Sequence, residues 1–235
     1  MSMKSRWIAW PLLVALGSAL GAGPAVADHD DEDKGGKRKG RAIYEVAITN
    51  LTKDQVFSPP VIVTHTSQIS VFEGGQKASA GLVLVAEDGK GELLADDLGA
   101  SREVFEALAT GTPVMPGHTE VFEIEGRGRF DRISVVSMLV NTNDAFLGVD
   151  SQPLPTGRGS SHGFAAPGYD AGSEANNEDC GSIPGPACPE GSGNARDPEE
   201  GVVHVHNGVH GVGDLAPAAY DWRNPVARVV VTRMR

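Results

Sequence analysis

The segment Ala-Ile-Tyr-Glu-Val-Ala-Ile-Thr, residues 42–49, decides the fold class, because its side chains alternate in character. Tyr44, Val46 and Ile48 share one face, and the opposite face carries a glutamate and a threonine. A strand has this period of two, so one face of the segment is buried and the other meets water. The segment therefore predicts a half-buried strand that ends at Asn50.

Similar short apolar runs recur along the chain. The further strands that they predict are residues 61–66, 118–125, 132–140, 202–206 and 226–233. The apolar run at residues 81–86, with residues 92–98 and 102–109, indicates a region of short helices. Ser101 is the expected N-cap of the segment 102–109, whose apolar residues have helical spacing. Six or so short strands joined by glycine- and proline-rich turns indicate an all-β sandwich with inserted helices.

The composition favours short structural elements and argues against one class of function. The chain has 235 residues, a formal net charge of −11, 30 glycines and 15 prolines. The many glycines and prolines favour short elements joined by turns. The acidic balance argues against nucleic-acid binding, because no basic surplus is present to neutralise phosphates.

The N-terminal region has the pattern of an export signal. Lys4 and Arg6 precede an uncharged apolar run at residues 8–22, and small residues at 25–27 form a cleavage site. The run is shorter than the roughly 20 residues that span a bilayer, so we expect no transmembrane segment. The sequence predicts a signal peptide at 1–27, a charged disordered linker at 28–41 and a sandwich domain at 42–235. The product is expected to be exported, either secreted or periplasmic.

Residues 151–200 contain nine glycines and seven prolines and few apolar side chains. We interpret this region as a long functional or partly disordered loop that contributes no core element. Cys180 and Cys188 lie within it, and in an oxidising compartment they are expected to form a disulfide. The small loop that they close lies outside the predicted core strands.

Several blocks of sequence, in order along the chain, resemble the spondin N-terminal domain family, known from F-spondin and mindin of the animal extracellular matrix. The blocks are residues 58–67, 72–75, 78–82, 86–89, 137–140, 143–150, 169–174 and 225–235. The resemblance implies an antiparallel sandwich of about eight strands, like those of calcium-dependent membrane-binding modules. The chain departs from the animal domains at Ala145, where they have tryptophan, and it lacks their cysteines after Asp150.

The same resemblance implies a calcium site. Asp144 and Asp170 match family positions that bind calcium, and Glu174 replaces the second aspartate of the family's Asp-Ala-Gly-Thr-Asp loop. Carboxylates on glycine-containing loops are the ligands that calcium prefers. Asp150 is a weaker candidate. The alternative explanation is turn chemistry, because aspartate in loops binds its own backbone.

A histidine-rich segment offers a different kind of site. His204 and His206 share one face of a short predicted strand, and His210 follows a glycine turn. Neutral imidazoles at such spacing bind zinc or copper, with Asp214 available to complete a site. His65 is instead expected to be a hydrogen-bonded core or turn histidine.

No nucleophile elbow, zinc-protease motif or phosphate loop is present in the sequence. We therefore expect a secreted calcium-binding module that acts in extracellular binding or adhesion on an unidentified protein, glycan or lipid surface. The alternative is a histidine-ligated transition-metal protein, including a metal-dependent hydrolase.

Overall fold

The computed structural model describes residues 40–189, 195–198 and 201–235. The predicted signal peptide and nearly all of the predicted linker lie outside the described residues. Within the described residues, no helix combines the length and the apolar character that crossing a membrane requires.

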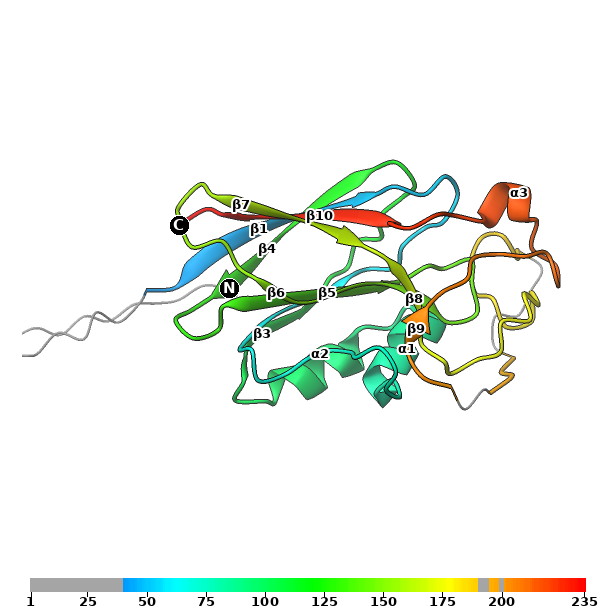
Figure 1. Ribbon diagram of the computed structural model, residues 1–235, viewed down its shortest axis with the longest axis horizontal. Coiled ribbons are helices and arrows are strands. Elements are labelled where there is room, and N and C mark those ends of the chain that lie inside the picture. The colour runs from blue at the N-terminus through cyan, green and yellow to red at the C-terminus, as the bar shows by residue number, and fades with distance from the viewer. Residues whose placement is uncertain (1–39, 190–194, 199–200) are drawn as a thin grey trace, which may run out of the picture. The chain divides into compact units, whose positions relative to one another are not determined.

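Two antiparallel sheets face each other as a sandwich (Figure 1). The four-stranded sheet has the order β4 (Thr119–Gly126), β1 (Ala42–Asn50), β10 (Ala227–Arg233), β7 (Ser161–Ala166). The six-stranded sheet has the order β3 (Val104–Ala109), β2 (Val61–His65), β5 (Arg132–Met138), β6 (Ala145–Pro153), β8 (Gly168–Asp170), β9 (His204–Val205). The predicted antiparallel β-sandwich is confirmed, with ten strands in place of about eight.

The strand β1 has the strict alternation that its sequence predicts. Every second side chain from Ala42 to Asn50 is buried, and the residues between are partly exposed. Its buried face contributes Tyr44, Val46 and Ile48 to the main core between the two sheets. The sequence of β1 therefore fixes which of its faces points inward.

Two helices cover the outer face of the six-stranded sheet (Figure 1). They are α1 (Ala80–Asp88) and α2 (Glu92–Gly99), and a four-residue helix, α3 (Pro217–Tyr220), lies far from them in sequence. Leu82, Val85 and Leu94 form a second core with side chains of this sheet. Because the sheet is covered on both faces, all five residues of β2 are buried.

Two local predictions are wrong. Residues 104–109, expected to be part of a helix, form β3, which pairs with β2 from Val61↔Ala109 to His65↔Val104. Ser101 accepts a hydrogen bond from the Glu103 backbone N–H in the turn before β3, so it caps no helix. Pairing with a buried strand outweighs the weak helical spacing of this segment.

Residues 151–200, expected to lack core elements, contain β7 and β8. β7 pairs with β10 from Ala227↔Ala166 to Thr232↔Ser161, and β8 pairs with β6 through Ala145↔Asp170. Both strands are short, and glycines interrupt their apolar residues. The alternation of apolar and polar residues that marks a strand was therefore too weak to recognise in this glycine-rich region.

Two strand glycines give a matched test of packing. A Cβ on Gly148 of β6 would lie 2.5 Å from Phe72 Cζ and 2.8 Å from Tyr169 Cδ2, whereas one on Gly163 of β7 would meet nothing closer than 3.9 Å. Phe72 and Tyr169 pack with their ring centroids 4.9 Å apart, so neither ring can yield easily. We expect Gly148→Ala to lower the free energy of unfolding by about 1–3 kcal/mol. Gly163→Ala is the control and should change it by less than about 0.5 kcal/mol. Urea titration of both variants measures this, and equal effects would contradict the packing argument.

Candidate metal centre

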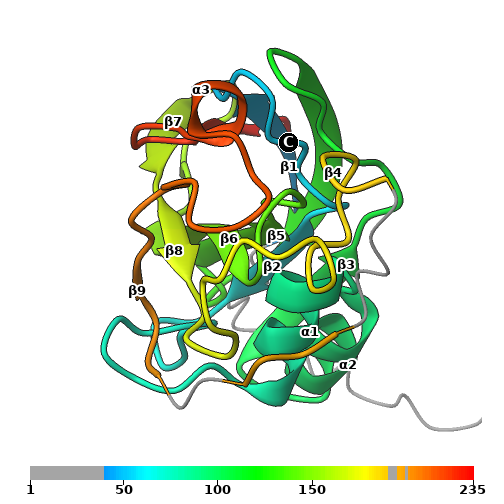
Figure 2. The same cartoon turned by 90° about the vertical axis from the view of Figure 1, so that its right-hand side faces the viewer.

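Acidic side chains gather at the end of the sandwich where β8 stops and β6 begins. Asp144 directly precedes β6, and Asp170 is the last residue of β8. The register Ala145↔Asp170 places the two ends side by side, and the backbone N–H of Ala171 donates to the Asp144 carbonyl at 3.2 Å. Figure 2 shows the loops around β8 and α1 from this end.

Asp144 is fully buried and only half satisfied. Its Oδ2 accepts hydrogen bonds from the Ser173 backbone N–H at 2.8 Å, the Ser173 hydroxyl at 3.2 Å and the Glu174 backbone N–H at 3.1 Å. Its Oδ1 is buried without a partner among the described residues. Burial and the neighbouring Asp170 raise the pKa of Asp144 to about 6, although the hydrogen bonds to its carboxylate oppose this.

Glu174 is 1 % exposed, and neither of its carboxylate oxygens has a hydrogen-bond partner among the described residues. The nearest cation is Arg196, whose Nε lies 3.7 Å from Oε1. Burial, followed by the charge of Glu87, raises the pKa of Glu174 to about 7, and Arg196 offsets part of this rise. A buried carboxylate without hydrogen bonds is costly unless a cation accompanies it.

Asp170 is better satisfied than the other two carboxylates. Its Oδ1 accepts from the Gly172 backbone N–H at 2.7 Å, and its Oδ2 accepts from the Asn176 side chain. The first bond closes the turn that the sequence also predicted from aspartate chemistry. His204 Nε2 and His206 Nε2 each lie 3.8 Å from Oδ2.

Sequence reasoning missed three residues beside this group. Glu87 and Asp88 end helix α1, and Arg196 Nε lies 3.1 Å from Glu87 Oε2 while its guanidinium also pairs with Asp88. The Ala-Glu-Asp-Gly block at residues 86–89 was part of the family resemblance, so a signal was present. Its acidic residues were not linked to the others because they lie more than 50 residues away in sequence.

Asp150 lies apart from this group. Its Oδ1 accepts from the Val71 backbone N–H at 2.7 Å and from the Ser134 hydroxyl at 2.8 Å. Ser134 Oγ is also 2.7 Å from Nε2 of His65, which is completely buried. Asp150 therefore has a structural role in the described geometry, and His65 is a hydrogen-bonded core histidine as expected.

His204 and His206 contact different partners, and His210 is exposed. His206 is buried, its Nδ1 accepts from the Gly208 backbone N–H at 2.9 Å, and its Nε2 lies 3.0 Å from Asn176 Oδ1. Both ring nitrogens are thus engaged, and burial lowers the pKa of His206. His204 is largely exposed, with Nδ1 2.9 Å from the Val202 carbonyl. Among the described residues, no three histidine, cysteine, aspartate or glutamate side chains are grouped closely enough to hold a metal ion unaided.

The segment after His206 is anchored through a carboxylate. Glu178 Oε1 accepts from the His210 backbone N–H at 2.6 Å, and Oε2 accepts from those of Gly211 and Val212 at 2.7 and 3.0 Å. Charge-assisted bonds of this kind hold a loop firmly. Glu178 therefore fixes the loop that carries His210, a role that its sequence position did not reveal.

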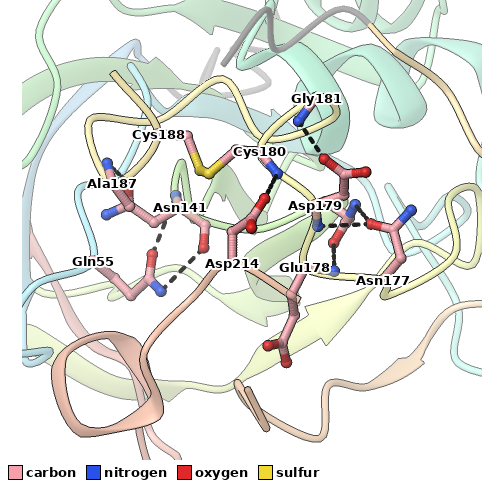
Figure 3. The surroundings of a disulfide bond; sticks show 11 residues. Gln55, Asn141, Asn177, Glu178, Asp179, Cys180, Gly181, Ala187, Cys188 and Asp214 are labelled. Carbon is pink, nitrogen blue, oxygen red and sulfur yellow. Dashed lines mark hydrogen bonds between the residues drawn. A yellow bond between two sulfur atoms is a disulfide. The ribbon is translucent and has the colours of Figure 1, made fainter. Parts of the chain in front are cut away.

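The predicted disulfide is present, with an S–S distance of 1.98 Å between Cys180 and Cys188 (Figure 3). Asp214 accepts a hydrogen bond from the Cys180 backbone N–H at 3.0 Å, so its carboxylate is used to hold this loop. The loop is less peripheral than expected, because Ile183 is fully buried and packs in the main core with Cys188. The bridge thus fixes a core side chain as well as a surface loop.

A comparison with family models matches residues 49–174 to Spondin_N, which is more than half of the chain. The chain belongs to the Spondin_N family. The predicted family resemblance is therefore confirmed, and the matched region contains Asp144, Asp170 and Glu174. The histidine segment and the disulfide lie after it. No curated protein matches the chain significantly. Spondin_N domains form a family of non-catalytic modules, and some of them bind metal ions.

The raised carboxylate pKa values predict an inverted pH dependence in metal-free protein. Folded Glu174 holds its proton up to about pH 7, whereas the unfolded chain releases it near pH 4.5. Between these values the folded state binds more protons, so its stability falls as pH rises. Between pH 4.5 and 7.5, we expect the free energy of unfolding to fall by about 1–3 kcal/mol less in Glu174→Gln than in the unaltered protein.

Urea titrations of both proteins in chelator, at several pH values, measure the difference. The comparison cancels the titration of all other groups. If the difference between the two proteins did not change with pH, the carboxylate would be ordinarily solvated.

Proposed function

We propose that this protein is a secreted calcium-binding module of the spondin type, which acts in extracellular binding or adhesion rather than catalysis. The observation that carries the proposal is the set of three buried carboxylate oxygens on Asp144 and Glu174 that accept no hydrogen bond from any described residue. All three are acceptors, so the missing partner is a donor or a cation.

The chemistry of these groups fits calcium. The donor set consists of carboxylate oxygens on loops, which a hard divalent cation prefers. Calcium also takes backbone carbonyls and water as ligands, so a complete cage of side chains is not required. Asp144 and Glu174 would hold the ion, with Asp170 and Glu87 as neighbouring carboxylates. The charge of the ion would offset the burial and repulsion that raise the pKa values of Asp144 and Glu174.

The residues around the site also support a binding role. The ligands belong to the loop after β8 and to the residue before β6, so a bound ion would fix these segments against each other. A shaped loop surface beside the ion would then be available to a partner. The expected partner is a protein, a glycan or a lipid surface, and binding assays with each class would distinguish them.

Export is part of the proposal. The disulfide between Cys180 and Cys188 supports an oxidising compartment, since such bonds persist outside the cytoplasm. The predicted signal peptide points the same way. Millimolar calcium is common outside cells, which suits a site of modest affinity.

Calcium should raise the thermal midpoint of chelator-treated protein. A ligand that binds only the folded state stabilises it by about 2.7 kcal/mol at a hundredfold excess over its dissociation constant. We expect Glu174→Gln to raise the midpoint without calcium, because a buried charge is removed, and to abolish most of the calcium response. Asp170→Asn should weaken the response more than Asp150→Asn does.

Glu73→Gln is the matched control, because it removes the same charge from an exposed side chain. The compared quantity is the calcium-induced shift, so an intrinsic effect of Asp150→Asn on stability does not enter. An unchanged melting curve in millimolar calcium would refute the proposal. Stoichiometric zinc in metal analysis of the purified protein would favour the histidine-ligated alternative instead.

A further inference from the structure

A cavity lies at the opposite end of the sandwich from Asp144, where β1 begins and β10 ends. Its volume is about 360 Å³. Strand β6 connects the two ends, because Asp144 directly precedes it and Leu154, which lines the cavity, directly follows it. Nine strand residues separate them, which is roughly 30 Å of extended chain.

An arginine points into this cavity from a core position. Ala227, Val229 and Val231 of β10 are buried in the main core, and Arg233 continues the same alternation. Arg233 pairs with Tyr44 across the β1–β10 ladder, so both side chains lie on the inner face of the sheet. A charged residue in an inward-facing row departs from the pattern that a core requires.

Two side chains that can donate hydrogen bonds line this cavity. Tyr44 is 6 % exposed, and its phenol can donate one hydrogen bond. Arg233 Nη1 donates to the Thr156 carbonyl, but its Nε is buried without a partner within the described range. Burial raises the pKa of Tyr44 in spite of the nearby Arg233, so the hydroxyl keeps its proton and can donate.

The rest of the lining combines one further cation with an apolar wall. Arg127 lines the rim, and Phe130 and Leu154 provide apolar surface. The one acidic side chain of the lining, Asp131, is exposed and lies 3.5 Å from Arg132 Nε. Gly126 keeps the cavity open beside the tyrosine, since a Cβ there would lie 2.8 Å from the Tyr44 ring. The lining is therefore net positive, in a protein whose formal charge is −11.

We propose that this cavity binds a small organic anion, whose carboxylate or phosphate accepts hydrogen bonds from Tyr44 and Arg233 and whose apolar part packs on Phe130 and Leu154. A guanidinium matches the oxygens of either group through two parallel donors. The buried oxygens of Asp144 and Glu174 that lack hydrogen bonds are acceptors, whereas the buried Arg233 Nε at this cavity is a donor. The two ends therefore select ligands of opposite charge.

Binding is tested by NMR titration of the full exported chain in calcium-containing buffer, with benzoate, inorganic phosphate and benzylamine as probes. We expect benzoate to bind saturably below about 10 mM, with shifts around Tyr44 and Arg233. Arg233→Gln should weaken binding about tenfold and Tyr44→Phe about threefold, because each removes a donor. Phosphate that competes with benzoate would place both oxyanions in one site. Phosphate that does not compete would restrict the ligand class to carboxylates.

Arg228→Gln is the matched control, since Arg228 is an exposed arginine on the same strand. If Arg228→Gln weakened benzoate binding as much as Arg233→Gln does, general electrostatic attraction would explain the binding and the proposal would be overturned. Equal binding of benzylamine, or no saturable benzoate binding, would overturn it too. Should Arg233→Gln fail to fold, Tyr44→Phe decides alone, because it removes one hydroxyl and leaves the ring packing intact.

Discussion

The hydrogen bonds from the loop after β8 to the buried carboxylate of Asp144 organise the end of the sandwich where the acidic side chains gather. The backbone N–H groups of Ser173 and Glu174 both donate to Oδ2. They fix the loop against the first residue of β6 and direct the Glu174 side chain into the interior. The arrangement gives Oδ2 of Asp144 its hydrogen bonds and leaves Oδ1 buried without a hydrogen-bond partner among the described residues. The carboxylate of Asp144 thus forms structural hydrogen bonds and also belongs to the proposed cation site.

The sandwich places the buried acceptors of Asp144 and Glu174 and the donors of Tyr44 and Arg233 at opposite ends. Antiparallel strands bring loops from distant parts of the sequence together at each end, while the core between the ends is filled by aliphatic side chains. Asp144 and Glu174 lie at one end, and Tyr44 and Arg233 lie at the other. Charged groups that are roughly 30 Å apart interact weakly even across a protein interior, by about 0.5 kcal/mol at an effective dielectric constant of about 20. The two proposed ligands would therefore affect each other's binding little.

Much of the fold followed from the sequence, and the reasons for the failures are physical. The alternation in β1 was strong enough to fix its buried face. Residues 104–109 fitted a helix as well as a strand, and only pairing with β2 decided between them. β8 is too short to leave a periodic signal, so it emerges only from tertiary contacts, whereas β9 lies within the strand predicted at residues 202–206.

The candidate site was predictable in part. Asp144, Asp170 and Glu174 were found through the family's loop pattern, and the register of β6 with β8 brings their loops together. Asp150 carried a similar local signal, but its position within β6 directs it to Ser134 instead. Glu87 and Arg196 join the group through folding alone, because no local pattern links a helix end to a loop more than 100 residues later.

The order of the four-stranded sheet has a consequence for how the chain reaches its destination. Its two central strands are β1 and β10, the first and last strands of the described chain, and they pair along seven residues. Contacts between such distant segments form late, because a long stretch of chain must first be closed into a loop. The four-stranded sheet therefore cannot form until the residues between β1 and β10 are present. For a protein moved across a membrane as an unfolded thread, this topology postpones folding until the thread has passed through.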